Sequence, residues 1–202
     1  MARKTKEEAE KTRILILETA LDVFYERGYS RSTLVDIAKQ IDMTKGAIYW
    51  HFKSKVDLFL GLGTYMEEKL EVSLADLFTH PEGIDDIRHL PVCLVKLVAE
   101  DAQLNKYYSL IYYRMEWQDE LLPVKDFFIK QDEEFKQYAE LLFQKAQERG
   151  DIKRTLPVAP MAITWLALID GFMSRVLLEK EKLESLLADM EFGINIYIAG
   201  LK

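Results

Sequence analysis

Cysteine and histidine are too scarce in this sequence to build several kinds of site. Cys93 is the single cysteine, which excludes an internal disulfide and a cysteine-based zinc centre, since both need at least two sulfurs. The three histidines, His51, His80 and His89, form no H-x-x-x-H pair, so we expect neither a metal nor another cofactor. The motifs G-x-S-x-G, G-x-G-x-x-G, G-x-x-x-x-G-K-[ST] and H-E-x-x-H are also missing, and we therefore expect no catalytic residues and no enzyme.

A long hydrophobic run is missing as well. The longest apolar stretch, from Leu156 to Ile169, has 14 residues, whereas a membrane-spanning helix needs about 20. The N-terminal segment MARKTKEEAEKTR lacks the apolar core of a secretory signal. We therefore expect a cytoplasmic protein with no membrane partner, in which Cys93 is an inert core residue and His80 and His89 lie at the surface.

Glycine and proline are also infrequent, at 9 and 5 of 202 residues, and the stretches between them have helical periodicity. This pattern predicts an all-α fold. The charge is uneven: residues 1–60 hold 11 Lys and Arg against 9 Asp and Glu, although the whole chain has a net charge of −7. We therefore divide the chain into a slightly basic N-terminal module, residues 7–60, and an acidic body, residues 61–202, with the pattern loosening at 80–83.

Periodicity and capping signals also place the individual helices. A helix from Glu7 to Arg27 comes first, followed by two short helices and a long one that ends near Phe78. Pro91 predicts that the first helix of the body is kinked or starts late. Capping signals mark four helix starts, namely Thr5 with Glu8, Thr33 with Asp36, Thr44, and Ser54 with Asp57. In the body we expect helices at about 84–101, 103–117, 121–149, 158–180 and 183–200.

The two short helices, joined by a turn at 40–43, have the outline of a helix-turn-helix over residues 33–52. The second helix of that motif enters the major groove of DNA. In this second helix, TKGAIYWHF, Ile48 and Phe52 lie four residues apart and can pack inward. The opposite face then carries Thr44, Lys45 and Tyr49, while Gly46 allows the backbone to approach DNA closely.

The run TLVDIAKQIDMTKGAIYWHFKSKVDLF, residues 33–59, closely resembles the DNA-binding signature of the TetR/AcrR family of bacterial repressors. The segments MARKTKEEAEKTR and LIYYRMEW (110–117) are similar to the branch of that family that represses multidrug efflux pumps. The resemblance implies a homodimer with a three-helix DNA-binding head and a body that binds a ligand and dimerises. Carried over by position, the expected DNA contacts are Thr33, Thr44, Lys45, Tyr49, His51 and Lys55, to which we add the backbone at Gly46. Thr44 and Lys45 would lie nearest the bases, and Tyr49, His51 and Lys55 would hold phosphates.

Three residues depart from the family pattern. Asp42 stands in the turn where the family usually has glycine, and aspartate tolerates a left-handed conformation better than most residues do. Met43 replaces a usual valine in the core. Lys45 replaces a frequent arginine, so the paired donors that arginine offers to guanine are not carried over.

Aromatic residues gather in the body, and five of them fall between residues 107 and 117. One interpretation is an ordinary helical core. The resemblance instead implies a pocket for a hydrophobic or cationic small molecule, for which aromatic walls are suited. Glu67 matches an acidic position of the efflux-repressor branch. The residues expected to line the pocket are Glu67, Tyr112, Met115, Glu116, Trp117 and Trp165.

The last two predicted helices each carry an apolar stripe that we expect to join two subunits. Two such helices from each chain would form a four-helix bundle. The alternative is that both stripes pack within one chain. The first stripe is Ala162, Trp165, Ile169, Phe172 and Val176, and the second is Leu186, Met190, Gly193 and Tyr197.

These expectations describe a ligand-responsive transcriptional repressor of a multidrug efflux operon. It would bind a palindromic operator in double-stranded DNA as a homodimer and leave it when a hydrophobic or cationic small molecule binds the body. Within the same family, the alternatives are control of lipid or biosynthetic genes, and activation in place of repression. Outside it, the alternatives are an enzyme and a helical carrier that does not bind DNA.

Overall fold

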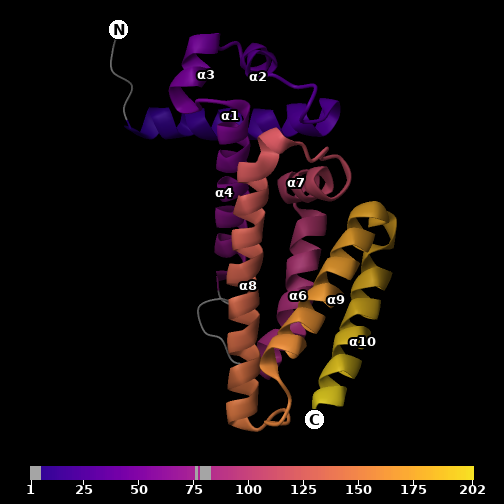
Figure 1. Ribbon diagram of the computed structural model, residues 1–202. Helices are drawn as coiled ribbons and strands as arrows, with labels where there is room; N and C mark the ends of the chain where they lie inside the picture. The colour runs from indigo at the N-terminus through magenta and orange to yellow at the C-terminus, as the bar shows by residue number, and fades with distance from the viewer. Residues whose placement is uncertain (1–5, 76, 78–82) are drawn as a thin grey trace. The chain divides into compact units, whose positions relative to one another are not determined.

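The computed structural model describes residues 6–75, 77 and 83–202, and the regular structure in these ranges is helical throughout (Figure 1). The all-α prediction is therefore confirmed. The predicted cap at Thr5 and the predicted surface position of His80 lie outside the described residues. The α-helices are α1 (Lys6–Arg27), α2 (Leu34–Gln40), α3 (Lys45–His51), α4 (Lys55–Ser73), α6 (Ile84–Glu100), α7 (Ala102–Tyr113), α8 (Leu122–Arg149), α9 (Val158–Leu178) and α10 (Leu183–Leu201), and the short 3-10 helices are η1 (Asp119–Leu121) and η2 (Lys180–Lys182).

The chain forms two compact units. The first unit holds the described residues through Leu70 together with Lys106–Phe127, and the second holds Glu71–Asn105 and Phe128–Lys202. The first unit therefore combines the helix-turn-helix with the whole aromatic segment 107–117, which the sequence division assigns to the body. The division of the sequence at residues 60 and 61 stays a prediction.

In the first unit, α1 supports α2, and α2 in turn packs against α3 (Figure 1). Three buried aromatic rings form its centre. Phe24 lies 5.3 Å from Tyr29 and 5.8 Å from Phe59 between ring centroids, and the rings of Tyr29 and Phe59 meet edge to face at 5.4 Å. These contacts tie the end of α1 to the start of α4, and so fix the frame on which α2 and α3 are held.

In the second unit, Pro91 lies inside α6, where its missing N–H leaves the carbonyl of Ile87 without its helical hydrogen bond. The indole N–H of Trp165 in α9 donates to this carbonyl at 2.8 Å, and the Trp165 side chain is fully buried. The orphaned acceptor is thus satisfied from a neighbouring helix. α6 begins at Ile84 and includes Pro91, so the predicted late start is wrong, and the alternative of a kink stays a prediction.

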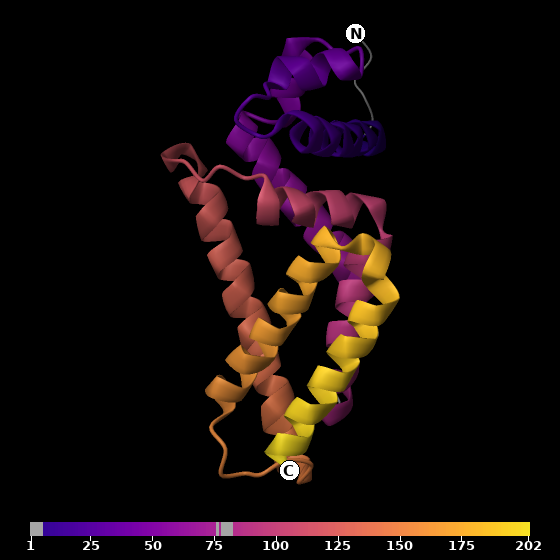
Figure 2. The ribbon, with the colours of Figure 1, turned by 90° about the vertical axis from the view of Figure 1, so that its right-hand side faces the viewer.

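Within the same unit α10 packs against α6 and α9, as Figure 2 shows for α9 and α10. This packing hides most of the two stripes that we expected between subunits; Trp165, Val176 and Met190, for example, are fully buried. The assignment of the seam to these stripes is therefore wrong, and packing within one chain is confirmed for their buried members. The two helices expose a second apolar set, namely Ile163 (54% exposed), Leu178 (64%), Phe192 (67%) and Ile196 (57%).

By length and composition alone, α9 is the one candidate for a membrane span among the described residues. Its inner face is part of the core of the second unit, with Ala162, Trp165 and Ile169 buried. Core helices of water-soluble proteins pass the same test, so the composition of α9 carries no further conclusion.

Three local predictions are corrected. α7 ends at Tyr113, not near 117. The side chain of the next residue, Arg114, donates to the Tyr25 carbonyl, and its guanidinium lies 4.3 Å from the centre of the Tyr25 ring. α4 ends at Ser73, and the predicted end at Phe78 lies outside the described residues. Cys93 is exposed, since the inner stripe of α6 runs through other positions, including Leu90 and Val95.

Candidate DNA-binding interface

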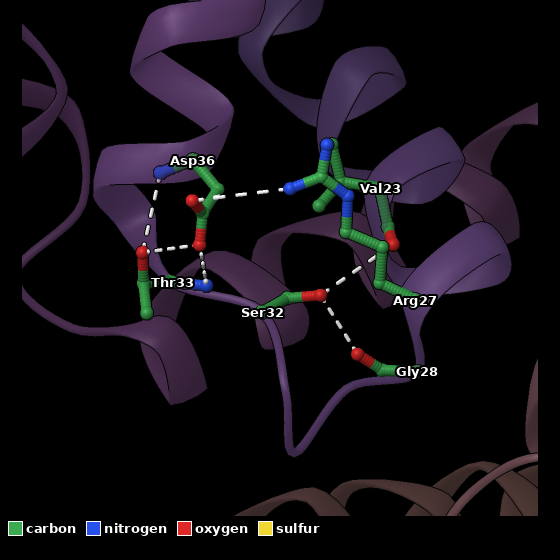
Figure 3. A network of polar contacts seen from close by, with 6 residues as sticks. All are labelled: Val23, Arg27, Gly28, Ser32, Thr33 and Asp36. Atoms are coloured by element: carbon green, nitrogen blue, oxygen red, sulfur yellow. Dashed lines mark hydrogen bonds and ion pairs between the residues drawn. The ribbon is translucent and has the colours of Figure 1, made fainter.

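The start of α2 is held by the predicted capping box (Figure 3). The Thr33 hydroxyl accepts a hydrogen bond from the Asp36 backbone N–H at 3.2 Å, and the Thr33 backbone N–H donates to Asp36 Oδ2 at 3.0 Å. The Thr33 hydroxyl also donates to the same carboxylate oxygen at 2.6 Å. This hydroxyl contact, and more weakly the nearby guanidinium of Arg27, lower the pKa of Asp36 below its ordinary value.

A second set of contacts joins this cap to the end of α1 (Figure 3). The Ser32 hydroxyl lies 2.7 Å from the Gly28 carbonyl and 3.4 Å from the Val23 carbonyl, so it caps the last turn of α1. Gly28 has a left-handed φ of 81°, which ends the helix at little cost. Arg27 reaches Asp36 at 3.9 Å. Each of these contacts between the cap and the end of α1 joins residues no more than nine positions apart along the chain.

These contacts bear on the predicted DNA contact at Thr33. Its hydroxyl and its backbone N–H are both directed to Asp36, so a phosphate at this position would have to replace a carboxylate that already accepts both donors. Thr33 as a DNA contact stays a prediction. Its role as the cap of α2 is confirmed.

The turn between α2 and α3 explains the first departure from the family pattern. Asp42 has a φ of 51°, and it is the only non-glycine residue with a positive φ in the described part of the chain. The backbone N–H of Met43 closes the turn by donating to the Ala38 carbonyl at 2.9 Å. The turn thus has the left-handed conformation that glycine adopts freely and that aspartate tolerates at a small cost.

Thr44 caps α3, as predicted, by accepting a hydrogen bond from the Ala47 backbone N–H at 3.2 Å. Ile48 and Phe52 face inward and are buried, which leaves Lys45 and Tyr49 on the outer face. The Tyr49 side chain is 45% exposed, and the Lys45 ammonium lies 5.4 Å from the centre of its ring. The predicted outer face of α3 is therefore present, with a cation beside an aromatic ring.

Gly46 also lies on this exposed surface. A Cβ atom built there would meet only the Thr44 hydroxyl, at 4.0 Å. Nothing in the described structure therefore requires a glycine at this position, which is compatible with a close approach by DNA.

Trp50 is the exposed residue of α3 that sequence reasoning missed. It is 71% exposed, and its ring meets that of His51 edge to face with the centroids 4.5 Å apart. His51 itself is half-buried. The signal was present in the helical spacing, because a helix that turns Ile48 and Phe52 inward must turn Trp50 outward.

Lys55, the predicted phosphate contact at the start of α4, is already surrounded by groups of the first unit. Its ammonium donates to the Tyr29 carbonyl at 3.1 Å, lies 4.1 Å from the centre of the Tyr29 ring and is 3.9 Å from the carboxylate of Glu120. Only 20% of the Lys55 side chain is exposed. The spacing of the residues did not indicate these partners.

The predicted ligand-binding residues fall into three groups. Glu67 of α4 lies near Tyr107, a buried residue whose pKa is raised by burial and then by Tyr108 and Glu67. The segment after α7 holds Met115, Glu116 and Trp117, and Tyr112 lies in the last turn of α7. The side chains of Tyr112 and Trp117 are 37% and 48% exposed. Glu116 accepts a hydrogen bond from Ser30 at 3.5 Å. Trp165 is in the core of the second unit.

The structure places five of the six residues in the first unit and Trp165 in the second, and the ligand role of each stays a prediction. It does show a tight group around Glu67 within the first unit. A Cβ atom at Gly63 would lie 2.8 Å from the Phe127 ring and 3.1 Å from the Tyr107 hydroxyl, so α4, α7 and the start of α8 approach closely there. Two open cavities of about 410 and 500 Å³ lie elsewhere and contain none of the six; they are lined by Gln144, Gln147, Glu148 and Arg154, and by Ile84, Arg88, Gly150, Asp151, Ile152, Lys153 and Lys202.

Comparison with known proteins agrees with this geometry. A family model described as bacterial regulatory proteins, tetR family, matches residues 16–62. The probable HTH-type transcriptional regulator ArpR of Pseudomonas putida is 31% identical over 96% of this chain and 93% of its own length. The HTH-type transcriptional repressor BepR of Brucella suis is 32% identical over 85% of this chain and 83% of its own length.

Among solved structures, NalD of Pseudomonas aeruginosa, the secondary repressor of the MexAB-OprM multidrug efflux pump, is 26% identical with a TM-score of 0.75, over 93% of this chain and 98% of that one. A capped helix-turn-helix within an all-α chain, matched over nearly its full length by such regulators, defines a DNA-binding transcriptional repressor. The chain belongs to the TetR family of bacterial regulatory proteins.

Proposed function

We propose that this protein represses a multidrug efflux operon, and that a hydrophobic or cationic small molecule releases it from a palindromic operator. The observation that carries the proposal is the outer face of α3, where Thr44, Lys45, Gly46 and Tyr49 are exposed on a capped helix. The similarity to NalD, which is described as the secondary repressor of a multidrug efflux pump, supports the choice of regulated genes.

On DNA, the N-terminal end of α3 would enter the major groove, with Lys45 and the backbone at Gly46 nearest the bases. Tyr49, His51 and Lys55 would contact phosphates, and the exposed indole of Trp50 would be a further contact. The Lys45 ammonium lacks the two parallel N–H donors of an arginine guanidinium. Its contact should therefore discriminate between bases less strongly than an arginine would.

The protein would bind DNA as a homodimer, because one helix-turn-helix covers only half of a palindrome. The exposed apolar set on α9 and α10 supports a subunit interface there, since Leu178, Phe192 and Ile196 are more than half exposed in the single chain. This set replaces the buried stripes that we first assigned to the interface. Two copies of this face, related by a two-fold axis, would bury each other.

The small molecule would bind beside Glu67 and Tyr107. A carboxylate near aromatic rings attracts a cation, and the tight packing at Gly63 means that a ligand must displace α4, α7 or α8 to enter. Such a ligand lowers DNA affinity only as far as it prefers the displaced arrangement.

Fluorescence anisotropy with the DNA upstream of the protein's own gene tests this function. We expect the wild-type protein to bind this DNA in preference to a shuffled sequence of the same composition, and Tyr49→Ala to weaken binding to both by similar factors. Cationic dyes and hydrophobic drugs should then release the labelled DNA, and Glu67→Gln should reduce release by the cations more than by neutral compounds. Acyl-CoA, added in the same assay, tests the lipid-regulator alternative. No preference for the upstream DNA would contradict the proposal.

A further inference from the structure

Lys55 has three different partners within the first unit, and one of them is acidic. The Tyr29 carbonyl accepts a hydrogen bond from the Lys55 ammonium, and the Tyr29 ring lies beneath it. The third partner, Glu120, lies in η1, far along the chain from α4, and brings a full negative charge to 3.9 Å from the same ammonium.

A DNA phosphate and the Glu120 carboxylate would bind the same group, the ammonium of Lys55. Both are anions that accept hydrogen bonds from an ammonium group, and the Lys55 ammonium also has its two contacts with Tyr29. The Lys55 side chain is 20% exposed, so little of its surface is open to a second anion while Glu120 stays in place. The Glu120 side chain is 51% exposed and can move into solvent.

Other contacts hold the segment that carries Glu120 against the helix-turn-helix. Arg114 contacts Tyr25 of α1 through both the carbonyl and the ring, and Glu116 accepts a hydrogen bond from Ser30. Tyr29, the shared neighbour, is buried, and its hydroxyl has no hydrogen-bond partner among the described residues. The segment is therefore anchored at two points before Glu120, which keeps the carboxylate close to Lys55.

We propose that Glu120 is an internal competitor of the operator phosphate for Lys55, so that operator binding exchanges the Glu120 carboxylate for a phosphate and Glu120 lowers operator affinity. The proposal rests on the proposed function in one respect, namely that Lys55 contacts the DNA backbone. It adds an affinity-determining residue that lies outside the helix-turn-helix. It also gives the segment after α7 a direct effect on DNA binding.

The test is a double-mutant cycle on operator affinity, measured by anisotropy at fixed salt. Glu120→Gln should tighten operator binding about two- to fivefold, the range expected for loss of one partly exposed ion pair. Asp119→Asn is the matched control, because it removes one negative charge from the same turn, whereas the carboxylate that pairs with Lys55 is that of Glu120. In a Lys55→Gln background, which should itself weaken binding, the gain from Glu120→Gln should vanish.

Each outcome is decisive. An equal gain from Asp119→Asn, or a gain from Glu120→Gln that persists in the Lys55→Gln background, would mean a general charge effect and overturn the proposal. Weaker binding by Glu120→Gln would mean that Glu120 positions Lys55 for DNA, which also overturns it. If the wild-type protein bound no DNA, the proposed function itself would fail. Specific binding with no coupling between Lys55 and Glu120 would overturn only this inference.

Discussion

We predict that the hydrogen bond from Trp165 to the Ile87 carbonyl compensates for the helical hydrogen bond that Pro91 cannot make. Pro91 cannot donate to that carbonyl, and the Trp165 indole N–H does so at 2.8 Å in a fully buried position. Replacing Trp165 with phenylalanine keeps an aromatic ring but leaves the carbonyl without a donor. A buried polar group left unpaired costs about 1–3 kcal/mol. The smaller ring adds a cavity cost, because Trp165 packs against Phe135 and Phe143.

The cavity cost and the hydrogen-bond cost can be separated in a Pro91→Ala background. An alanine at 91 brings back a backbone N–H, which donates to Ile87 from within α6. The carbonyl has two lone pairs and can accept both donors, so Trp165→Phe then costs only the cavity term. We therefore expect Trp165→Phe to be about 1–3 kcal/mol less destabilising in the Pro91→Ala background than in the wild type.

Urea unfolding followed by circular dichroism measures the four free energies of this cycle. All four proteins are compared at one protein concentration, because the stability of a dimer depends on concentration. The slope of the free energy against urea should stay constant across the set. A Trp165→Phe cost that agrees in the two backgrounds within about 0.5 kcal/mol would refute the reasoning.

Three further predictions follow from other parts of the chain. Asp42→Gly should raise the free energy of unfolding by roughly 1 kcal/mol, because Asp42 holds a φ of 51°; no gain in thermal unfolding would contradict this. Ile196→Ala should raise the dimer dissociation constant about 30- to 150-fold, because burying this 57% exposed side chain in both subunits of a dimer contributes roughly 2–3 kcal/mol. Ile129→Ala on α8, at a residue that is 55% exposed, is the control and should leave the dimer unchanged in sedimentation. Asp36 has a pKa below its ordinary 3.8, so its capping contribution is complete above that value and is lost as the pH falls through the lower folded pKa. The difference in melting temperature between the wild type and Asp36→Asn should therefore be constant above pH 5 and shrink in acid. A difference that grows in acid would contradict this prediction.

The helix-turn-helix could be predicted because its determinants are local. Thr33 and Asp36 are three residues apart, Thr44 caps α3 from the residue before it, and the inward pair Ile48 and Phe52 follows from helical spacing. Such signals lie within one or two helical turns, where the sequence order is also the spatial order. The left-handed conformation of Asp42 could be anticipated from the family resemblance, because the family usually has glycine at that position.

The parts that could not be predicted depend on residues far apart along the chain. The Tyr29 and Glu120 contacts of Lys55 and the Trp165 contact that compensates for Pro91 have no local pattern. The error in the dimer seam has another cause. Apolar residues occupy more than one face of α9 and α10, and periodicity shows that a helix has an apolar face without showing whether its own chain or a partner covers it.

The composition of the first unit limits how a ligand could act on DNA binding. Glu67 and Tyr107, beside which we place the ligand, belong to the same packing unit as α1, α2 and α3. α7 links the proposed ligand position to α1 directly. Lys106 of α7 forms an ion pair with Asp22 of α1 at 2.6 Å, and Arg114, just after α7, contacts Tyr25 of α1. A ligand that displaced α7 near Tyr107 would therefore strain the contacts of α7 to α1 within the first unit. Coupling along this route needs no signal from the dimer interface, so a single chain with Ile196→Ala should still respond to the ligand in its contacts between α7 and α1.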